Sequence, residues 1–386
     1  MDPLERGEAS PAATGTLVVI HEDRPSARVG VELAVLSVRR NSPGVDILVS
    51  WPGIDAGLAH WLRARGVAVL DEPAFADRGW NIKPTLLGVG LDRGAREVVW
   101  LDTDIIAAGD IRPLLAGCGA DEVVVSDEHY WGISHGGTVR TELWGLAVGR
   151  TLTATANSGF VRVTGAHRGL LAAWRALLDC PQYAAVQRRA WETRPVHMVG
   201  DQDVLTALLG SRRFAHLPVR YLRRGRDIAL NFGPAGYSVA ERLGNLGRGL
   251  PPLVHCSGPK PWETPAVTSV GGGLRAWYRR AFLEVCEYTA VARAYRDEID
   301  GSALALDVRT GLGRLCRVLG GGQPNLQSLP LAVFHGALRR VKRAFVGTSW
   351  PTDPARIPAA DRPDGEAIVA RALAAIDGHA ARETAA

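Results

Sequence analysis

One apolar run of the chain carries two acids in its middle: Val98-Val99-Trp100-Leu101-Asp102-Thr103-Asp104-Ile105-Ile106. The apolar residues before the acids predict a buried strand that delivers two carboxylates at its end. Because side chains alternate along a strand, Asp102 and Asp104 are expected to point the same way. An unpaired buried carboxylate is costly, so we expect a cation or a hydrogen-bonding ligand beside them. The alternative is that the strand ends at Leu101 and the acids cap a solvated loop.

Around this run, apolar strands alternate with amphipathic helices. We predict strands at 16–20, 45–50 and 67–70, and helices at 26–40 and 55–65. This alternation indicates a parallel sheet with helices on both faces, in which ligands bind beyond the carboxyl ends of the strands. The two acids lie at such an end.

Composition excludes several classes of protein. Of 386 residues, 46% are hydrophobic and 22% are charged, which is typical of a globular chain and not of a disordered or fibrous one. The net charge is +5, but of 45 basic residues only Lys83, Lys260 and Lys342 are lysine. This arginine bias resembles a coding preference more than a nucleic-acid footprint, so no nucleic-acid partner is expected.

Cysteine usage and the N-terminus bear on the compartment. The five cysteines include no Cys-x-x-Cys pair, which favours a reducing compartment without a structural zinc site. Residues 1–15 lack the apolar core of a signal peptide, and no run approaches the roughly 20 apolar residues of a membrane span. The sequence therefore predicts a soluble cytoplasmic protein.

Three more polar motifs follow along the chain. They are Asn157-Ser158-Gly159 at the entry to a strand, Gly200-Asp201-Gln202-Asp203 at the start of a helix, and His255-Cys256-Ser257-Gly258-Pro259-Lys260-Pro261-Trp262. Two carboxylates and a distant imidazole make a plausible octahedral site for Mn²⁺ or Mg²⁺ when phosphate oxygens fill the remaining positions.

The C-terminal third differs in composition. After Gly271-Gly272-Gly273 we predict helices at roughly 275–297, 302–319 and 331–346. The expected domains are a flexible N-terminus at 1–15, the α/β domain at 16–270, a helical extension at 271–350, and a loose tail with a short helix at 351–386. The basic stretch at 338–345 allows a peripheral membrane contact, although a solvated helix face is the simpler interpretation.

The four motifs, in this order, resemble glycosyltransferase family 8 over roughly residues 16–262. The resemblance implies a GT-A fold, an α/β nucleotide-diphospho-sugar transferase sandwich, here with a C-terminal helical extension. It implies an enzyme that uses Mn²⁺ or Mg²⁺ to move a hexosyl group from a UDP-sugar, or less favourably a GDP-sugar, to a hydroxyl of a small-molecule or glycan acceptor, with retention. One departure is that a single residue, Pro259, separates Gly258 from Lys260, where the family has two.

The resemblance also implies roles for individual residues. The metal ligands would be Asp102, Asp104 and His255, and the catalytic residues would be Asp127, Asp201, Gln202 and Lys260. The residues that contact the donor would be His21, Asp23, Lys83, Asp102, Asn157, Gly258 and Lys260, of which Gly258 and Lys260 would meet the diphosphate. His21 and Asp23 follow from their place after the first strand, and Lys83 is included because lysine is so rare here.

Alternatives remain at this stage. An inverting enzyme of the same fold shares the metal and diphosphate chemistry. A sugar-1-phosphate nucleotidyltransferase needs a Gly-rich phosphate loop after the first strand, which 21–25 does not provide, and a non-catalytic binding protein would have lost part of the metal set. Locally, Asn157-Ser158-Gly159 also fits a tight turn, Asp201 a helix N-cap, and Lys83 a solvated helix start.

Overall fold

The computed structural model describes residues 15–128, 136–263, 273–299, 306–346 and 357–383. Within them, a seven-stranded sheet has the order β3-β2-β1-β4-β7-β6-β8. All neighbours in this sheet pair in parallel except β7, which is antiparallel to both β4 and β6. The chain is therefore a mixed α/β protein with a mostly parallel central sheet, as the alternating pattern predicts.

A second, three-stranded sheet has the order β5-β10-β9. In it, β10 is antiparallel to β5 and parallel to β9. The strands of both sheets are β1 (Thr16–His21), β2 (Asp46–Ser50), β3 (Ala68–Leu70), β4 (Glu97–Leu101), β5 (Ile105–Ala107), β6 (Val123–Glu128), β7 (Thr155–Thr164), β8 (Val219–Leu222), β9 (Ile228–Leu230) and β10 (Leu253–His255).

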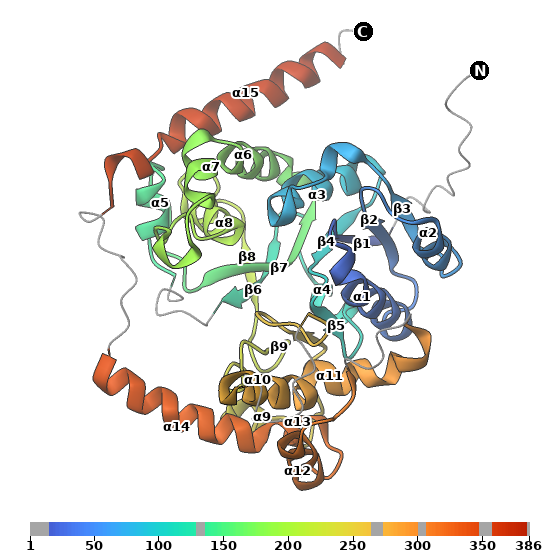
Figure 1. Cartoon of the computed structure of the whole chain (residues 1–386). Helices are drawn as coiled ribbons and strands as arrows, with labels where there is room; N and C mark the ends of the chain where they lie inside the picture. Colours follow the sequence, from blue (N-terminus) through green and yellow to red (C-terminus); the bar gives the residue numbers. More distant parts are fainter. Residues whose placement is uncertain (1–14, 129–135, 264–272, 300–305, 347–356, 384–386) are drawn as a thin grey trace.

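Helices surround the two sheets (Figure 1). They are α1 (Arg28–Asn41), α2 (Ala56–Arg63), α3 (Lys83–Asp92), α4 (Arg112–Leu115), α5 (Val139–Leu143), α6 (Arg168–Leu178), α7 (Pro181–Gln187), α8 (Asp201–Gly210), α9 (Val239–Gly244), α10 (Leu274–Val285), α11 (Glu287–Ala292), α12 (Gly311–Leu319), α13 (Pro324–Gln327), α14 (Leu329–Val346) and α15 (Gly365–Glu383). In this set no helix is both long and apolar enough to cross a bilayer.

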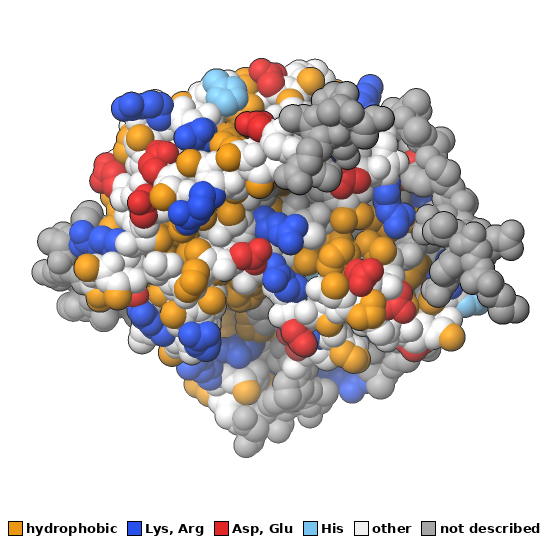
Figure 2. All heavy atoms as spheres, turned by 90° about the horizontal axis from the view of Figure 1, so that it is seen from above, with side chains coloured by type: hydrophobic (Ala, Val, Ile, Leu, Met, Phe, Trp, Pro, Cys, Tyr) orange, Lys and Arg blue, Asp and Glu red, His pale blue; other side chains and the backbone are white. Residues whose placement is uncertain are grey.

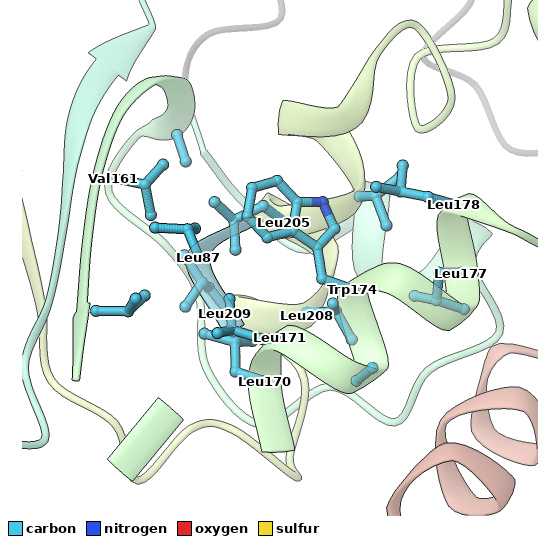
Figure 3. Packing of buried hydrophobic residues seen from close by; sticks show 14 of the residues in the cluster. Leu87, Val161, Leu170, Leu171, Trp174, Leu177, Leu178, Leu205, Leu208 and Leu209 are labelled. Carbon is cyan, nitrogen blue, oxygen red and sulfur yellow. The ribbon is translucent and has the colours of Figure 1, made fainter. Parts of the chain in front are cut away.

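The large sheet is buried on both faces because successive residues of its strands pack in different clusters. Leu17 and Val19 of β1 face the cluster formed with α3, α6 and α8, while Val18 and Ile20 face the cluster formed with α1 and α2. In the first cluster, Trp174 of α6 lies among leucines of α6 and α8 (Figure 3). A strand buried on both faces needs a nearly continuous apolar sequence, which is what β1 and β4 have.

The C-terminal helices differ partly from the prediction. Helices α10 and α11 are separate because the chain becomes extended at Cys286, and α12 begins only at Gly311. Residues of α10, α11, α12 and α14 share an apolar core with β5, β9, β10 and α1.

The predicted loose tail with a short helix is wrong in its described part. Helix α15 has 19 residues and contacts α6, and Val369 is buried in the main core. The backbone N–H of Gly365 also donates to the carbonyl of Trp144 at 2.9 Å.

The basic and acidic side chains of the face in Figure 2 are interspersed, without one sign dominating it.

Candidate functional site

Asp102 and Asp104 lie on the short turn between β4 and β5. Strand β4 ends at Leu101, as the alternative interpretation held, but the acids do not cap a solvated loop because Asp104 is only 8% exposed. The turn is held by the N–H of Asp102, which donates to the carbonyl of Gly159 at 2.9 Å, and by the N–H of Ile105, which donates to the carbonyl of Asp102 at 3.0 Å.

His255 reaches the same turn from the end of β10, which pairs with β5. Its Nε2 lies 3.2 Å from Asp104 Oδ1, and its buried Nδ1 has no hydrogen-bond partner among the described residues. Asp102, Asp104 and His255 each offer one ligand atom, and these atoms lie within 4.8 Å of one another. Two hard carboxylate oxygens and one imidazole fit Mn²⁺ or Mg²⁺.

Gly159 makes room for this group. A Cβ at this position would lie 2.8 Å from His255 Cε1 and 3.1 Å from Asp102 Oδ2. Any side chain here would therefore push two of the three candidate ligands.

Lys83 is the first residue of α3 and is only 3% exposed, so the interpretation as a solvated helix start is wrong. Its Nζ lies 2.9 Å from Ser158 Oγ, 3.1 Å from Asp102 Oδ1 and 3.4 Å from Asp201 Oδ2. Burial opposes the charged form, but the attraction of Asp102 and Asp201 outweighs it and raises the pKa of Lys83. The ammonium group thus neutralises the half-buried Asp102 and the buried Asp201 beside the cavity described below.

Lys260 lies on the other side of the acid pair. Its Nζ donates to Asp104 Oδ2 and, at 2.7 Å, to the carbonyl of Cys256. Burial alone would raise the pKa of Asp104, but the charges of Lys260 and His255 outweigh it and hold that pKa below its ordinary value. Asp104 is therefore ionised at neutral pH, the form in which a carboxylate can bind a cation.

Asn157, Ser158 and Gly159 lie inside the ten-residue strand β7 and do not form a tight turn. Asn157 Nδ2 donates to Glu128 Oε2 at 2.7 Å, and Ser158 Oγ donates to Asp201 Oδ2 at 2.6 Å. The strand thus connects the metal group to two further carboxylates.

Helix α8 begins at Asp201, and its N-cap is Gly200, so the N-cap prediction for Asp201 is wrong. The carboxylate of Asp203 instead accepts from the N–H of Gly200 at 3.1 Å and pairs with Arg140 at 2.7 Å. This leaves the Asp201 carboxylate to Ser158 and Lys83, while Gln202 Nε2 donates to Glu128 Oε2 at 3.4 Å.

These side chains line a cavity of about 780 Å³. Of the predicted site residues, its wall contains Lys83, Asp102, Asp104, Asn157, Asp201, Gln202, His255 and Gly258. Lys260, Asp127, His21 and Asp23 are not on the wall, although Lys260 contacts Asp104 behind it.

The wall carries Glu128 in place of Asp127. Neighbouring residues of a strand point to different faces, so only one of this pair can face the cavity. Burial raises the pKa of Asp127 to about 6, although the charge of Arg224 opposes the shift. Sequence reasoning did not identify Glu128, although its position beside Asp127 was a usable signal.

His21 is the last residue of β1 and Asp23 lies just after the strand; neither side chain lines the cavity. His21 Nδ1 lies 3.0 Å from Ser50 Oγ, and its Nε2 lies 3.9 Å from Asp23 Oδ2. Their contact with a nucleotide base stays a prediction.

No family model matches the sequence, and no curated protein matches it. Solved structures do. The galactosyltransferase LgtC in complex with donor and acceptor sugar analogues is 17% identical, over 73% of this chain and 100% of that chain, with a TM-score of 0.43. The glycosyltransferase GlyE of Streptococcus pneumoniae is 15% identical, over 73% of this chain and 64% of that one, with a TM-score of 0.38.

The bifunctional glycosyltransferase WbbM is 15% identical, with a TM-score of 0.42; the alignment covers 64% of this chain and 47% of that one, so the chain spans about half of its length. All three of these proteins are glycosyltransferases, the class that the sequence motifs resemble.

Proposed function

We propose that this chain is a divalent-metal-dependent glycosyltransferase that moves a hexosyl group from a nucleotide sugar to an acceptor hydroxyl. The observation that carries the proposal is the convergence of Asp102, Asp104 and His255, whose ligand atoms lie within 4.8 Å at the wall of a large cavity. A Mn²⁺ or Mg²⁺ ion held there supplies Lewis-acid chemistry to a diphosphate leaving group. UDP-sugars are favoured over GDP-sugars, and retention is proposed from the resemblance of the motifs.

Lys260 and Lys83 have distinct proposed tasks. Lys260 forms a salt bridge with Asp104. Its ammonium group would therefore lie where negative charge develops when a diphosphate departs, and a preorganised cation there stabilises that charge. Lys83 holds Asp102 and Asp201 in place through a bonding pattern that also includes Ser158. We propose that Lys83 fixes the geometry of the metal ligands and does not itself transfer a proton, because its ammonium group already contacts Asp102, Asp201 and Ser158.

The polar wall orients the transferred sugar. Asn157, Asp201 and Gln202 line the cavity, and their carboxylate and amide groups match the hydroxyls of a hexose. Glu128 joins Asn157 and Gln202 in one hydrogen-bond network, at 2.7 and 3.4 Å. This network would hold the sugar while Lys260 stabilises the charge of the leaving group.

We further propose that the enzyme works in the cytoplasm. All five cysteines are free thiols, and four of them are buried. Thiols persist in reducing compartments.

A panel of nucleotide sugars with Mn²⁺ tests the activity, read out as UDP or GDP released by slow donor hydrolysis. We expect release from one donor of the panel, and its loss in Asp104→Asn with an unchanged circular dichroism spectrum. The matched control is Asp92→Asn, since the Asp92 side chain is 64% exposed and paired only with Arg168 on the surface. Hydrolysis by Asp104→Asn at the wild-type rate would contradict the proposed metal role.

A further inference from the structure

The cavity has one polar and one apolar wall. The polar wall comes from the ends of β6, β7 and α8 and carries Glu128, Asn157, Asp201 and Gln202. The apolar wall comes from the end of β9, the segment that follows it, α9 and α14; it contains Leu230, Phe232, Val239, Ala240, Ala332, Val333, Gly336 and Ala337. Figure 1 shows α8 above and α14 below strand β9. A nucleotide sugar has no evident use for so large an apolar surface.

Helix α14 presents one face to this cavity. The residues that line it, Ala332, Val333, Gly336, Ala337 and Arg340, follow the three- and four-residue spacing of a helix face. Small side chains dominate this face, and a Cβ at Gly336 would meet no heavy atom within 4 Å. The face therefore leaves room for a ligand chain along the helix.

Two further features of α14 describe that ligand. Val333 is 54% exposed although it borders the cavity, so an apolar group of a ligand would cover it favourably. Arg340 lies on the same face and is exposed, and it makes no hydrogen bond or ion pair with the described part of the chain. A guanidinium beside an apolar groove suits an anionic group such as a phosphate.

We infer that the acceptor is a single amphiphilic molecule that carries an alkyl chain and an anionic group. Its hydroxyl end would face Asp201 and Gln202, its chain would lie along Val333 and Gly336, and its anionic group would meet Arg340. The identification of this ligand as the acceptor rests on the proposed function, whereas the groove itself does not.

Calorimetry with n-octyl phosphate, n-octyl glucoside and methyl glucoside, each below its micellar concentration, tests the inference. Each buried methylene contributes about fourfold in affinity. If half of the longer chain is buried, octyl glucoside should bind on the order of 100-fold more tightly than methyl glucoside. Octyl phosphate should bind more tightly still. Equal affinity of the octyl and methyl compounds would overturn the inference.

The two valines of α14 provide a matched pair of variants. Val333 and Val341 are 54% and 57% exposed on the same helix, but only Val333 lines the cavity. We expect Val333→Ser to lower the affinity for octyl glucoside at least about fivefold, since the substitution removes apolar contact. Val341→Ser should leave this affinity unchanged. Equal effects of the two substitutions would refute the groove.

Arg340→Gln tests the anionic group, with Arg279→Gln as control because Arg279 is exposed on α10 and does not line the cavity. Arg340→Gln should abolish the preference for octyl phosphate over octyl glucoside, and Arg279→Gln should keep it. Adsorption to phosphatidylglycerol vesicles without binding of monomeric octyl compounds would assign the surface to a membrane and overturn the inference.

The two proposals fail separately. Binding of UDP or GDP with Mn²⁺ to the wild-type protein reports on the proposed transferase site and does not require the groove. A protein that binds octyl phosphate but neither UDP nor GDP would refute the proposed function while supporting the groove, and the reverse result would refute only the groove.

Discussion

Gly159→Ala is the sharpest test of the metal-ligand geometry because it changes none of the ligands themselves. The added Cβ would lie 2.8 Å from His255 Cε1 and 3.1 Å from Asp102 Oδ2, whereas ordinary contacts begin at 3.4 Å. The imidazole must therefore retreat by about 0.6 Å and the carboxylate by about 0.3 Å. Metal–ligand distances tolerate only about 0.2 Å, so both shifts exceed the tolerance.

From this displacement we expect Mn²⁺ affinity to fall about 10- to 100-fold, the usual cost of disturbing the groups that orient metal ligands. That range corresponds to about 1.4–2.7 kcal/mol of binding free energy. Mn²⁺ is titrated in the absence of nucleotide and followed by electron paramagnetic resonance of the free ion, so the readout does not depend on activity.

The matched control is Gly88→Ala in helix α3, where an added Cβ would meet nothing within 4 Å. This control should bind Mn²⁺ like the wild type and gain up to about 1 kcal/mol of stability, because alanine is the better helix former. Wild-type Mn²⁺ affinity in a folded Gly159→Ala protein would refute the reasoning.

Three other predictions follow from the charges of the site and the core. Lys260→Ala should lower kcat by about 10²–10³-fold, and Lys260→Arg should keep only part of the activity lost in the alanine variant, because a planar guanidinium does not replace the compact charge of an ammonium group. Steady-state kinetics with the best donor measures both effects. A wild-type kcat in the alanine variant would show that Lys260 takes no part in the reaction. Burial raises the pKa of Asp127 to about 6, so the folded protein loses stability as the pH rises through that value and the carboxyl group ionises. The free energy of unfolding of Asp127→Asn should therefore exceed that of the wild type by about 1 kcal/mol at pH 8, a figure reduced for partial exposure, and should equal it at pH 4. Urea unfolding at both pH values measures this difference, and the same difference at pH 8 and pH 4 would contradict the prediction. Burial lowers the pKa of His197 to about 4, so its contribution is present above pH 6.5 and is lost as pH falls through 4. Wild-type stability should drop by about 2–3 kcal/mol more than that of His197→Gln between pH 7 and pH 4, and parallel pH curves for the two proteins would be the contrary result.

The alternating part of the fold could be predicted because local patterns specify it. The strands at 16–20 and 45–50 and the first helix agree with β1, β2 and α1 to within about two residues at each end. Their apolar residues are continuous or periodic, and this pattern reflects burial directly.

The choice between Asp127 and Glu128 could not be predicted, since it depends on strand register. The pairing of β6 with β7 shifts between Val125 and Ser126. The extra residues, 158–160, lie in β7, so the shift changes which residues of β7 lie beside the end of β6, and no periodicity in the sequence reveals it.

The C-terminal helices were the least predictable part. The sequence of α15 predicts a helix, but the length of this helix and its packing on α6 depend on contacts such as those of buried Val369. In the same way, the helical pattern of α14 does not show that Gly336 and Arg340 border the cavity, since that follows only from tertiary packing.

The most direct test of the central claim is calorimetry of UDP and GDP with Mn²⁺ and with EDTA. If Asp102, Asp104 and His255 hold the cation that the diphosphate contacts, at least one nucleotide should bind with Mn²⁺, lose at least about tenfold in affinity with EDTA, and recover when Mn²⁺ is returned in excess. Mn²⁺ should serve at least as well as Mg²⁺, because a histidine ligand suits it. Equal affinity in Mn²⁺ and EDTA would contradict the claim and remove the metal from the function.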